Sequence, residues 1–206
     1  MTQPTRPREA VARRAPARRL APALALAFVL AAVALPQHPA AREAAPPRTA
    51  TLEALFTPGD PIDARLSALI DGAKREVLVQ AFSFTSKRIA RALLAAHRRG
   101  VQVAIVADRA QTLELATSAV PGLARDGVPV WLDGNFVAAH NKVLVVDADT
   151  PAAAVVTGSY NFTSAAQFRN AENVLIVRGD RALAAQYREN LLRLRAKAVR
   201  YEGGAS

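Results

Sequence analysis

The sequence predicts an α/β sandwich, in which helices flank a central sheet of largely parallel or mixed strands. From residue 51 onward, short runs of apolar residues alternate with longer amphipathic segments, which is the pattern of strands alternating with helices. Apolar residues make up 51% of the chain and charged residues 21%, as in a globular protein. A chain of 206 residues is long enough for one domain with a substantial core.

The expected elements follow one another at short intervals. The first helix begins after Asp60-Pro61, because proline is favoured at the first helical position, and Ser86 can cap the second helix. The predicted strands are Leu52–Phe56, Val77–Phe82, Val101–Ala107, Val128–Leu132, Phe136–Val146, Ala153–Thr157 and Asn173–Val177. The predicted helices are Ile62–Lys74, Lys87–Arg99 and about Asp180–Arg200, with further helical sequence after Ala107.

The first 50 residues have the pattern of a leader and a linker. Six arginines precede an apolar run from Leu20 to Pro36, which is shorter than the ~20 residues that span a bilayer. The run therefore suits a signal peptide that is cleaved after Ala34, and an uncleaved signal anchor is the alternative. The expected protein is periplasmic or secreted, or anchored in the inner membrane if the leader stays. The predicted segments are 1–34 (signal peptide or anchor), 35–50 (Pro/Ala-rich linker) and 51–206 (functional domain).

Composition excludes several kinds of site. The chain has no cysteine and only three histidines, His38, His97 and His140, so we expect no disulfide, no thiol nucleophile and no histidine-built metal cluster. The net charge is +10, and residues 1–34 account for half of it. The remaining moderate positive charge suits nucleic acid or anionic lipid as a partner without selecting one, and it equally suits a solvated surface.

The segment AHNKVLVVD, residues 139–147, carries the most specific chemistry. His140 and Lys142 are two residues apart, so their side chains would share one face of the predicted strand. An imidazole can attack a phosphorus atom, and an ammonium group can neutralise charge on the non-bridging oxygens. A buried structural histidine beside an unrelated lysine explains the same pair, so this segment alone does not decide.

Two later segments favour phosphodiester chemistry. In Gly158-Ser159-Tyr160-Asn161, which follows a predicted strand, Ser159 and Asn161 could donate hydrogen bonds to a phosphate, and a helix N-terminus would add its field. Glu172 precedes another strand, and a carboxylate beside a buried strand is costly unless it is paired. Orienting a catalytic histidine is one such pairing.

Together these segments resemble the phospholipase D superfamily, whose signature is H-x-K-x4-D followed by G-S-x-N. The matching residues are His140, Lys142 and Asp147, and then Gly158, Ser159 and Asn161. Phe56–Gly59, Val79–Ser86, Ala95–Val101 and Asn170–Asn173 resemble the small, single-motif bacterial endonucleases of that superfamily, so the resemblance runs from about residue 54 to 198. It implies a phospholipase D-like α/β sandwich with a central mixed sheet flanked by helices and one motif per chain.

The resemblance also implies a role for each motif residue. His140 would be the nucleophile and form a covalent phosphohistidine, while Lys142, Ser159 and Asn161 would hold the phosphate oxygens. Glu172 would hydrogen-bond His140 and set its tautomer. Asp147 counts with the catalytic residues as part of the motif, although its role would be more structural than chemical.

Two further expectations follow from the motif. The family requires no metal or other cofactor. Ten residues, Ala148–Thr157, separate Asp147 from Gly158, where the family commonly has about six, and we interpret the difference as a longer hairpin loop.

One histidine is not enough for the whole reaction. Cleavage through a covalent intermediate needs a nucleophile and also an acid that protonates the leaving group. His97 falls in a predicted helix and His38 in the linker. We therefore expect a symmetric homodimer with a shared active site, in which His140 of each subunit meets at the two-fold axis; the resemblance implies the same arrangement.

Three functions stay open. The leading hypothesis is a nuclease that cleaves DNA, RNA or both with little sequence preference, with Lys87, Arg88 and Arg109 as candidate phosphate contacts. The second is a phospholipase D-type hydrolase of phospholipid head groups, which the low aromatic content of 5% mildly disfavours. Contact with a membrane would otherwise require that the leader is uncleaved. The third is an inactive nucleic-acid-binding protein, against which the intact set of motif residues argues.

Overall fold

A computed structural model describes residues 50–204, so the predictions for the leader and nearly all of the linker lie outside the described part. Among the described residues, no helix is both long and apolar enough to cross a membrane. The strands are β1 (Thr51–Thr57), β2 (Glu76–Ala81), β3 (Gln102–Asp108), β4 (Val130–Asp133), β5 (Lys142–Val146), β6 (Ala154–Gly158), β7 (Glu172–Arg178) and β8 (Val199–Tyr201). The helices are α1 (Ile62–Gly72), α2 (Lys87–Arg98), α3 (Arg109–Leu113), α4 (Val120–Arg125), α5 (Ser164–Phe168) and α6 (Arg181–Arg195).

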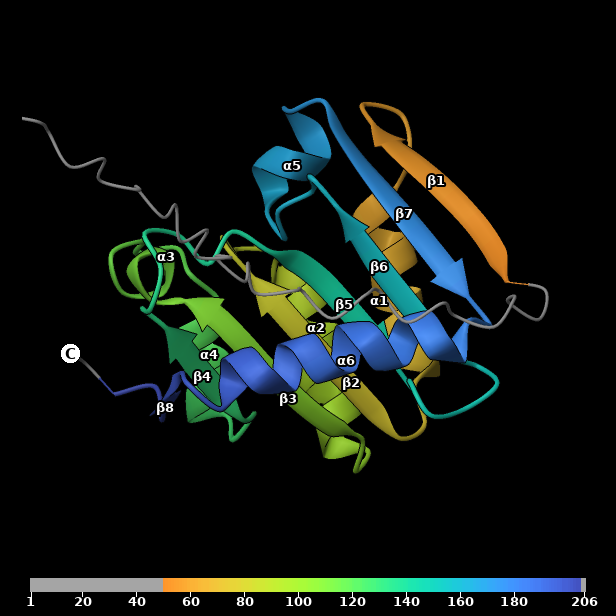
Figure 1. Cartoon of the computed structure of the whole chain (residues 1–206). Coiled ribbons are helices and arrows are strands. Elements are labelled where there is room, and N and C mark those ends of the chain that lie inside the picture. The colour runs from red at the N-terminus through yellow and green to blue at the C-terminus, as the bar shows by residue number, and fades with distance from the viewer. Residues whose placement is uncertain (1–49, 205–206) are drawn as a thin grey trace, which may run out of the picture. The chain divides into compact units, whose positions relative to one another are not determined.

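The eight strands form a single mixed sheet in the order β1-β7-β6-β5-β2-β3-β4-β8 (Figure 1). β2, β3 and β4 are parallel neighbours, and β5 lies antiparallel to β2. The carboxyl ends of these three strands therefore lie at the same edge as the amino end of β5. Successive antiparallel pairing brings the carboxyl end of β6 and the amino end of β7 to that edge too. We call it the front edge; it contains Ala81, Asp108, Asp133, Lys142, Gly158 and Glu172.

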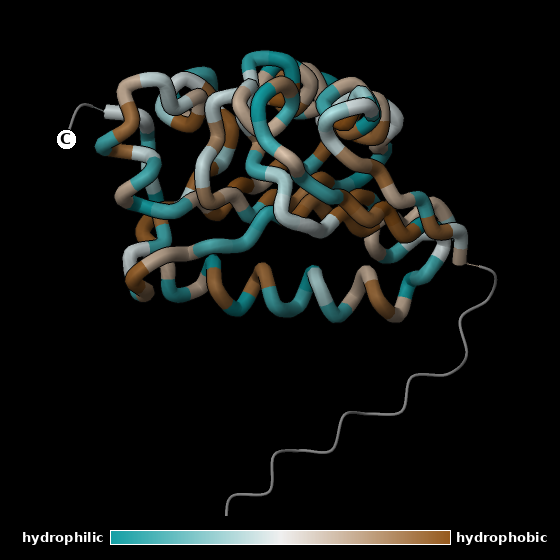
Figure 2. Tube along the Cα trace, turned by 90° about the horizontal axis from the view of Figure 1, so that it is seen from above, coloured by the Kyte–Doolittle hydropathy of each residue, from teal (hydrophilic) through white to brown (hydrophobic). Residues whose placement is uncertain are grey.

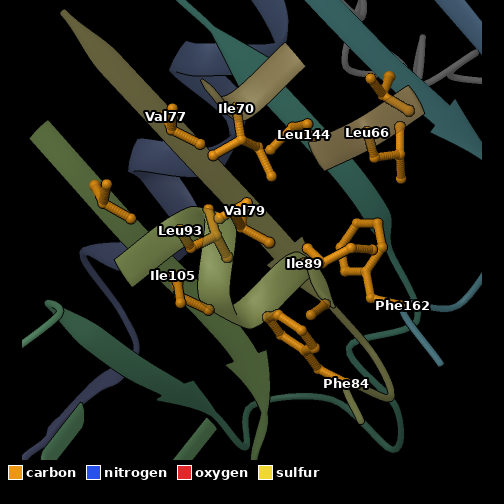
Figure 3. Close-up of a cluster of buried hydrophobic side chains, with 14 of the residues drawn as sticks. Leu66, Ile70, Val77, Val79, Phe84, Ile89, Leu93, Ile105, Leu144 and Phe162 are labelled. Carbon is orange, nitrogen blue, oxygen red and sulfur yellow. The ribbon is translucent and has the colours of Figure 1, made fainter. Parts of the chain in front are cut away.

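Two apolar layers form because successive residues of a strand point to opposite faces of the sheet. Val77 and Val79 of β2 belong to the larger layer, whereas Leu78 between them belongs to the smaller one. The helical side chains of the larger layer include Leu66, Ile70, Ile89 and Leu93 (Figure 3). On the other face α6 crosses the sheet and packs through Leu191, and Figure 2 shows a single helix on that side. The predicted fold class is confirmed.

One predicted strand, Phe136–Val146, is wrong in its first half. Residues 134–141 form a loop, and β5 begins only at Lys142. The backbone N–H groups of Asn135 and Ala139 donate to the carboxylates of Asp133 and Asp108, at 3.0 and 2.8 Å. Because side chains accept these hydrogen bonds, the segment is held as a loop rather than as a paired strand. His140 is accordingly exposed and does not lie on a buried strand.

Smaller differences occur at the ends of helices. The last helix ends at Arg195 rather than near Arg200, because Val199–Tyr201 pairs with β4 as the edge strand β8. The first helix ends at Gly72, two residues before the predicted end. The five-residue helix α5 between β6 and β7 was not predicted, since Ser164–Phe168 is too short for a recognisable helical period.

The loop between β5 and β6 lies at the opposite edge of the sheet, which we call the rear edge. β5 and β6 pair as an antiparallel hairpin from Val143 opposite Thr157 to Val146 opposite Ala154. The backbone turns through Thr150, whose N–H donates to the carbonyl of Asp147 at 2.9 Å. The ten-residue spacing thus includes a hairpin turn, as expected, and this turn lies away from the front edge; that it is longer than in the family stays a prediction.

Candidate active site

Most of the predicted site residues meet at the front edge. Lys142 begins β5, and Ser159 directly follows β6. Glu172 begins β7, the next strand of the sheet. Asn161 lies two residues after Ser159, and His140 lies in the loop two residues before Lys142. The sheet therefore brings together side chains that are up to 32 positions apart in the sequence.

Phe82 contacts both residues of the H-x-K pair. The ring centroids of Phe82 and His140 are 4.5 Å apart, and the Nζ atom of Lys142 lies 4.9 Å from the Phe82 centroid, within the range of a cation–π contact. Nζ also donates to the backbone carbonyl of His140 at 2.6 Å. The aromatic ring and this hydrogen bond bring the pair together, in place of the shared strand face that the spacing predicted.

Lys142 is a buried cation, with 6% of its surface exposed. Burial lowers the pKa of its ammonium group below the ordinary value, and the negative charge of Glu172 opposes part of that change. Among the described residues no carboxylate lies within salt-bridge distance of Lys142. A phosphate beside Nζ would favour the charged form, so the lysine is suited to hold a phosphodiester.

Ser159, Glu172 and Asn170 form a network of hydrogen bonds. The Ser159 hydroxyl donates to one oxygen of Glu172 at 2.5 Å, and the side-chain amide of Asn170 donates to the other at 2.9 Å. The Ser159 hydroxyl in turn accepts from the backbone N–H of Asn173 at 3.0 Å. These bonds orient Ser159 and Glu172 before any substrate binds.

The predicted hydrogen bond between Glu172 and His140 stays a prediction. Both Glu172 oxygens accept from Ser159 and Asn170, and the His140 ring makes no hydrogen bond with residues 50–204. The closest aromatic neighbour of the ring is Phe82, which leaves both imidazole nitrogens available to other groups.

The contacts of the G-S-x-N segment fix its backbone beside β7 and explain why its first residue is glycine. A Cβ atom at Gly158 would collide with the backbone carbonyl of Asn173 on β7, and the Ser159 N–H donates to that same carbonyl at 3.1 Å. Tyr160 points into the core, 1% exposed, and its hydroxyl donates to Gln167 at 3.1 Å; burial raises its pKa. Asn161 accepts a long hydrogen bond, 3.5 Å, from the N–H of Ser83.

Asp147 lies apart from the other motif residues, at the rear edge of the sheet. Its carboxylate is 3% exposed and accepts the backbone N–H groups of Lys74, Arg75 and Glu76 at 2.8–2.9 Å. Its backbone has φ +47°, a conformation that Asp and Asn tolerate better than most residues. These contacts give Asp147 a structural role: it joins the end of β5 to the turn before β2.

Sequence reasoning missed Phe82 and Asp108, which both stand at the carboxyl end of a parallel strand. Asp108 is 4% exposed; one oxygen caps α3 through the N–H of Gln111 at 2.9 Å, and the other accepts from Ala139, the residue before His140. In α/β sheets, ligands bind at the carboxyl ends of the strands, so the position of these residues was the signal available.

The candidate phosphate contacts also lie near the front edge. Lys87 and Arg88 begin α2, which follows β2, and Arg109 begins α3, which follows β3. Arg88 forms an ion pair with Asp63 at 3.2 Å, so its positive charge is partly neutralised and less available to a phosphate. Within residues 50–204, no group of three or more His, Cys, Asp and Glu side chains is arranged to hold a metal ion.

Comparisons with known proteins agree with this geometry. Residues 66–195 match the family described as cardiolipin synthase, PLD-like domain. A protein named phospholipase D from Rickettsia felis is 39% identical over 141 residues, which are 68% of each chain. A mitochondrial cardiolipin hydrolase from Xenopus tropicalis is 35% identical over 130 residues, which are 63% of this chain and 59% of that protein.

Solved structures show the same fold. The phospholipase D family member Nuc from Salmonella typhimurium has a TM-score of 0.69 and 32% identity over 74% of this chain and 99% of its own. NucT from Helicobacter pylori has a TM-score of 0.64 and 22% identity over 74% of this chain and 100% of its own, which supports the fold alone. The chain therefore belongs to the phospholipase D superfamily and is a phosphodiester hydrolase.

Proposed function

We propose that the protein is a metal-independent endonuclease with little sequence preference, which acts as a homodimer through a phosphohistidine intermediate. The observation that carries the proposal is the exposure of His140 and Ser159 on an open edge of the sheet. A phosphodiester inside a polymer has chain on both sides and cannot enter a closed pocket end first. A nucleophile on an exposed edge of the sheet can reach it. The similarity to the phospholipase D family member Nuc, over 99% of that chain, supports phosphodiester chemistry at this edge.

The reaction divides between two histidines. In the first step, an imidazole nitrogen of one His140 attacks phosphorus, a P–N bond forms and the P–O bond to the leaving group breaks. His140 of the second subunit donates the proton that the leaving alkoxide takes up. In the second step that histidine accepts a proton from water, and the hydroxide attacks the phosphohistidine and releases the first His140. Lys142, Ser159 and Asn161 stabilise the charge on the phosphoryl oxygens.

Hydrolysis of phospholipids is the second candidate, because relatives named phospholipase D and cardiolipin hydrolase are 39% and 35% identical to this chain over 141 and 130 residues. The chemistry at phosphorus is identical, so only the substrate distinguishes the two functions. The test is degradation of plasmid DNA in the presence of EDTA, beside hydrolysis of phosphatidylcholine and cardiolipin vesicles. DNA cleavage that survives EDTA and is lost in the His140→Ala variant supports the proposal. Lipid turnover without DNA cleavage overturns it in favour of the lipase, and inactivity on both supports a binding protein.

The proposal includes export from the cytoplasm, with the nuclease in the periplasm or outside the cell. It rests on the arginine-rich start and the apolar run Leu20–Pro36. Mass spectrometry of the protein recovered from its own cell envelope tests it: a chain that begins at Leu35 supports cleavage, and an intact leader in the membrane fraction supports the anchor.

The pH profile tests the role of Lys142. The protonated amine stabilises the phosphate charge, so activity should fall as pH rises through its pKa, which burial lowers. Arginine stays charged throughout this range; the Lys142→Arg variant should therefore lose this alkaline decline, although different geometry lowers its rate at pH 7 about ten-fold. The measurement is kcat/KM for bis(p-nitrophenyl) phosphate between pH 6 and 11. If kcat/KM of Lys142→Arg still falls at high pH as in the wild type, the fall is due to the titration of another group.

A matched pair of variants tests whether Asp108 positions the loop before His140. In Asp108→Ser the shorter side chain can still cap α3 but no longer reaches Ala139, and we expect kcat to fall between about ten- and a hundred-fold with KM little changed. In the control Asp180→Ser, the same substitution is made at the cap of α6, where Asp180 accepts from Leu183 at 2.9 Å, and kcat should stay near that of the wild type. Equal kcat in both variants would show that the Asp108 contact is only structural.

A further inference from the structure

The positive charge of the described residues is concentrated in one segment. Residues 50–180 carry thirteen basic and thirteen acidic side chains, so their net charge is zero. Residues 181–204, which form α6 and β8, carry six basic and two acidic side chains. The whole net charge of the described domain therefore belongs to its last 24 residues.

Four of these basic residues gather at the end of α6 and on β8: Arg193, Arg195, Lys197 and Arg200. We call them, with Trp131 of β4, the C-terminal basic surface. The guanidinium carbons of Arg195 and Arg200 lie 4.9 and 4.8 Å from the centroid of the Trp131 ring. Arg200 also pairs with Glu202 at 2.8 Å, whereas within residues 50–204 the other three cations have no carboxylate within salt-bridge distance.

Contact with Trp131 prepares the two arginines to bind an anion. A guanidinium group held against an aromatic ring loses less rotational freedom on binding, and its N–H groups at the edge remain free to donate. Paired N–H groups match the oxygens of a phosphate. The surface thus combines fixed arginines with the mobile charges of Arg193 and Lys197, both exposed.

The C-terminal basic surface lies on the α6 face of the sheet, next to the front edge that carries the active site. Val199 of β8 pairs with Leu132 near the carboxyl end of β4, and the side-chain amide of Asn135 in the loop before His140 donates to the carbonyl of Lys197 at 3.0 Å. Three strand spacings separate β4 from β5, or about 14 Å. Phosphates of one DNA strand follow each other at ~3.4 Å along the duplex axis, so about four nucleotides cover the distance.

We infer that the C-terminal basic surface binds the phosphate backbone of nucleic acid about four nucleotides from the bond that is cleaved. The inference rests on the proposed nuclease function and adds to it a second, non-catalytic contact. Nucleic acid is the partner we commit to, because the surface carries four cations. Val199 and, in the adjoining loop, Phe136 and Val137 are exposed apolar side chains that a bilayer could take up, so the test below includes vesicles.

The test compares two double variants of the full chain, both in the His140→Ala background so that DNA stays intact. Arg195→Gln with Lys197→Gln removes two charges from the surface, one of them a guanidinium held against Trp131. The control, Arg91→Gln with Arg98→Gln, removes two exposed charges from α2 on the opposite face of the sheet. Fluorescence anisotropy measures binding of a labelled double-stranded DNA 12-mer and of a dinucleotide between 50 and 200 mM salt.

We expect the first variant to bind the 12-mer on the order of ten-fold more weakly at 0.1 M salt, with the magnitude of the slope of log K against log salt reduced by about 1.8. The control should match the parent, and all three proteins should bind the dinucleotide equally, because it does not reach the surface. With His140 restored, hydrolysis of bis(p-nitrophenyl) phosphate should be the same in all three.

Equal 12-mer binding by the first variant and the control would overturn the inference. So would an unchanged affinity for DNA together with a lost affinity for phosphatidylglycerol vesicles, since this result would assign the surface to a membrane. Failure of the proposed function is a separate result: the protein with His140 present would then leave DNA uncut, whatever the variants bind.

Discussion

Replacement of His140 by alanine is expected to lower the rate of phosphodiester cleavage by at least about 10⁴-fold, as loss of a covalent nucleophile does in other hydrolases. Alanine removes the atom that forms the bond to phosphorus. The contact of Phe82 with the ring is lost as well, but His140 is exposed, so the fold should keep its stability. The measurement is the initial rate on plasmid DNA and on bis(p-nitrophenyl) phosphate.

His97→Gln is the matched control. His97 is the only other histidine among residues 50–204, and it lies in the last turn of α2, away from the front edge. Activity within about two-fold of the wild type is expected, because the substitution touches neither phosphate nor nucleophile. A His140→Ala variant that retains a tenth of the activity would rule out His140 as the nucleophile.

Mixing the His140→Ala variant with the wild type tests the shared site. If both copies of His140 act in one reaction, only dimers of two wild-type chains are active. After exchange of subunits, activity should therefore fall with the square of the wild-type fraction, so that an equal mixture keeps about a quarter of the activity of an undiluted wild type at the same total concentration. Activity that falls in direct proportion to the wild-type fraction would show that each chain catalyses the reaction without its partner.

Asp147→Ala should lower the free energy of unfolding by about 2–4 kcal/mol, because three backbone N–H groups lose their acceptor at once, one of them buried and two partly buried. Lys74, Arg75 and Glu76 donate these groups. Alanine at φ +47° adds a conformational cost. The measurement is the urea midpoint at constant slope.

Asp147→Asn separates the carboxylate from the backbone conformation. Asparagine tolerates the positive φ and keeps one side-chain oxygen. The free energy of unfolding of this variant should therefore fall by roughly 1–2 kcal/mol, the cost of one unsatisfied donor. Because Asp147 lies at the rear edge, the folded fraction of each variant should cleave its substrate with nearly the wild-type kcat. A large fall in kcat with unchanged stability would instead show that the residue takes part in the chemistry.

The central strands could be predicted from sequence because they are buried on both faces. Val77–Gln80 and Val143–Val146 are unbroken runs of mostly apolar residues, the pattern of strands covered on both sides. Residues 134–141 could not be assigned in the same way. Phe136, Val137 and two alanines resemble a strand, and only distant side chains, Asp108 above all, hold them as a loop.

Sequence indicated several of the residues that gather at the front edge, but it missed Phe82 and Asp108 and did not indicate the contacts. The motif spacing identified His140, Lys142, Ser159 and Glu172, since each residue type has a use at a phosphate. Whether Glu172 bonds to His140 or to Ser159 depends on the pairing of β6 with β7, which local sequence does not encode. The contacts of His140 and Lys142 with Phe82 likewise depend on a pairing of segments about sixty positions apart in the sequence.

The hairpin between β5 and β6 has a consequence for how such a domain can change over evolution. Its turn through Thr150 and Pro151 lies at the rear edge, where Asp147 fastens the end of β5 to the turn before β2. Changes in the length of this turn should therefore leave the register of β5 and the position of Lys142 unaltered, since Asp147 holds the strand end in place. The two ends of a single five-residue strand thus evolve under different constraints: one end tolerates changes in length, and the other must preserve the geometry of a reaction.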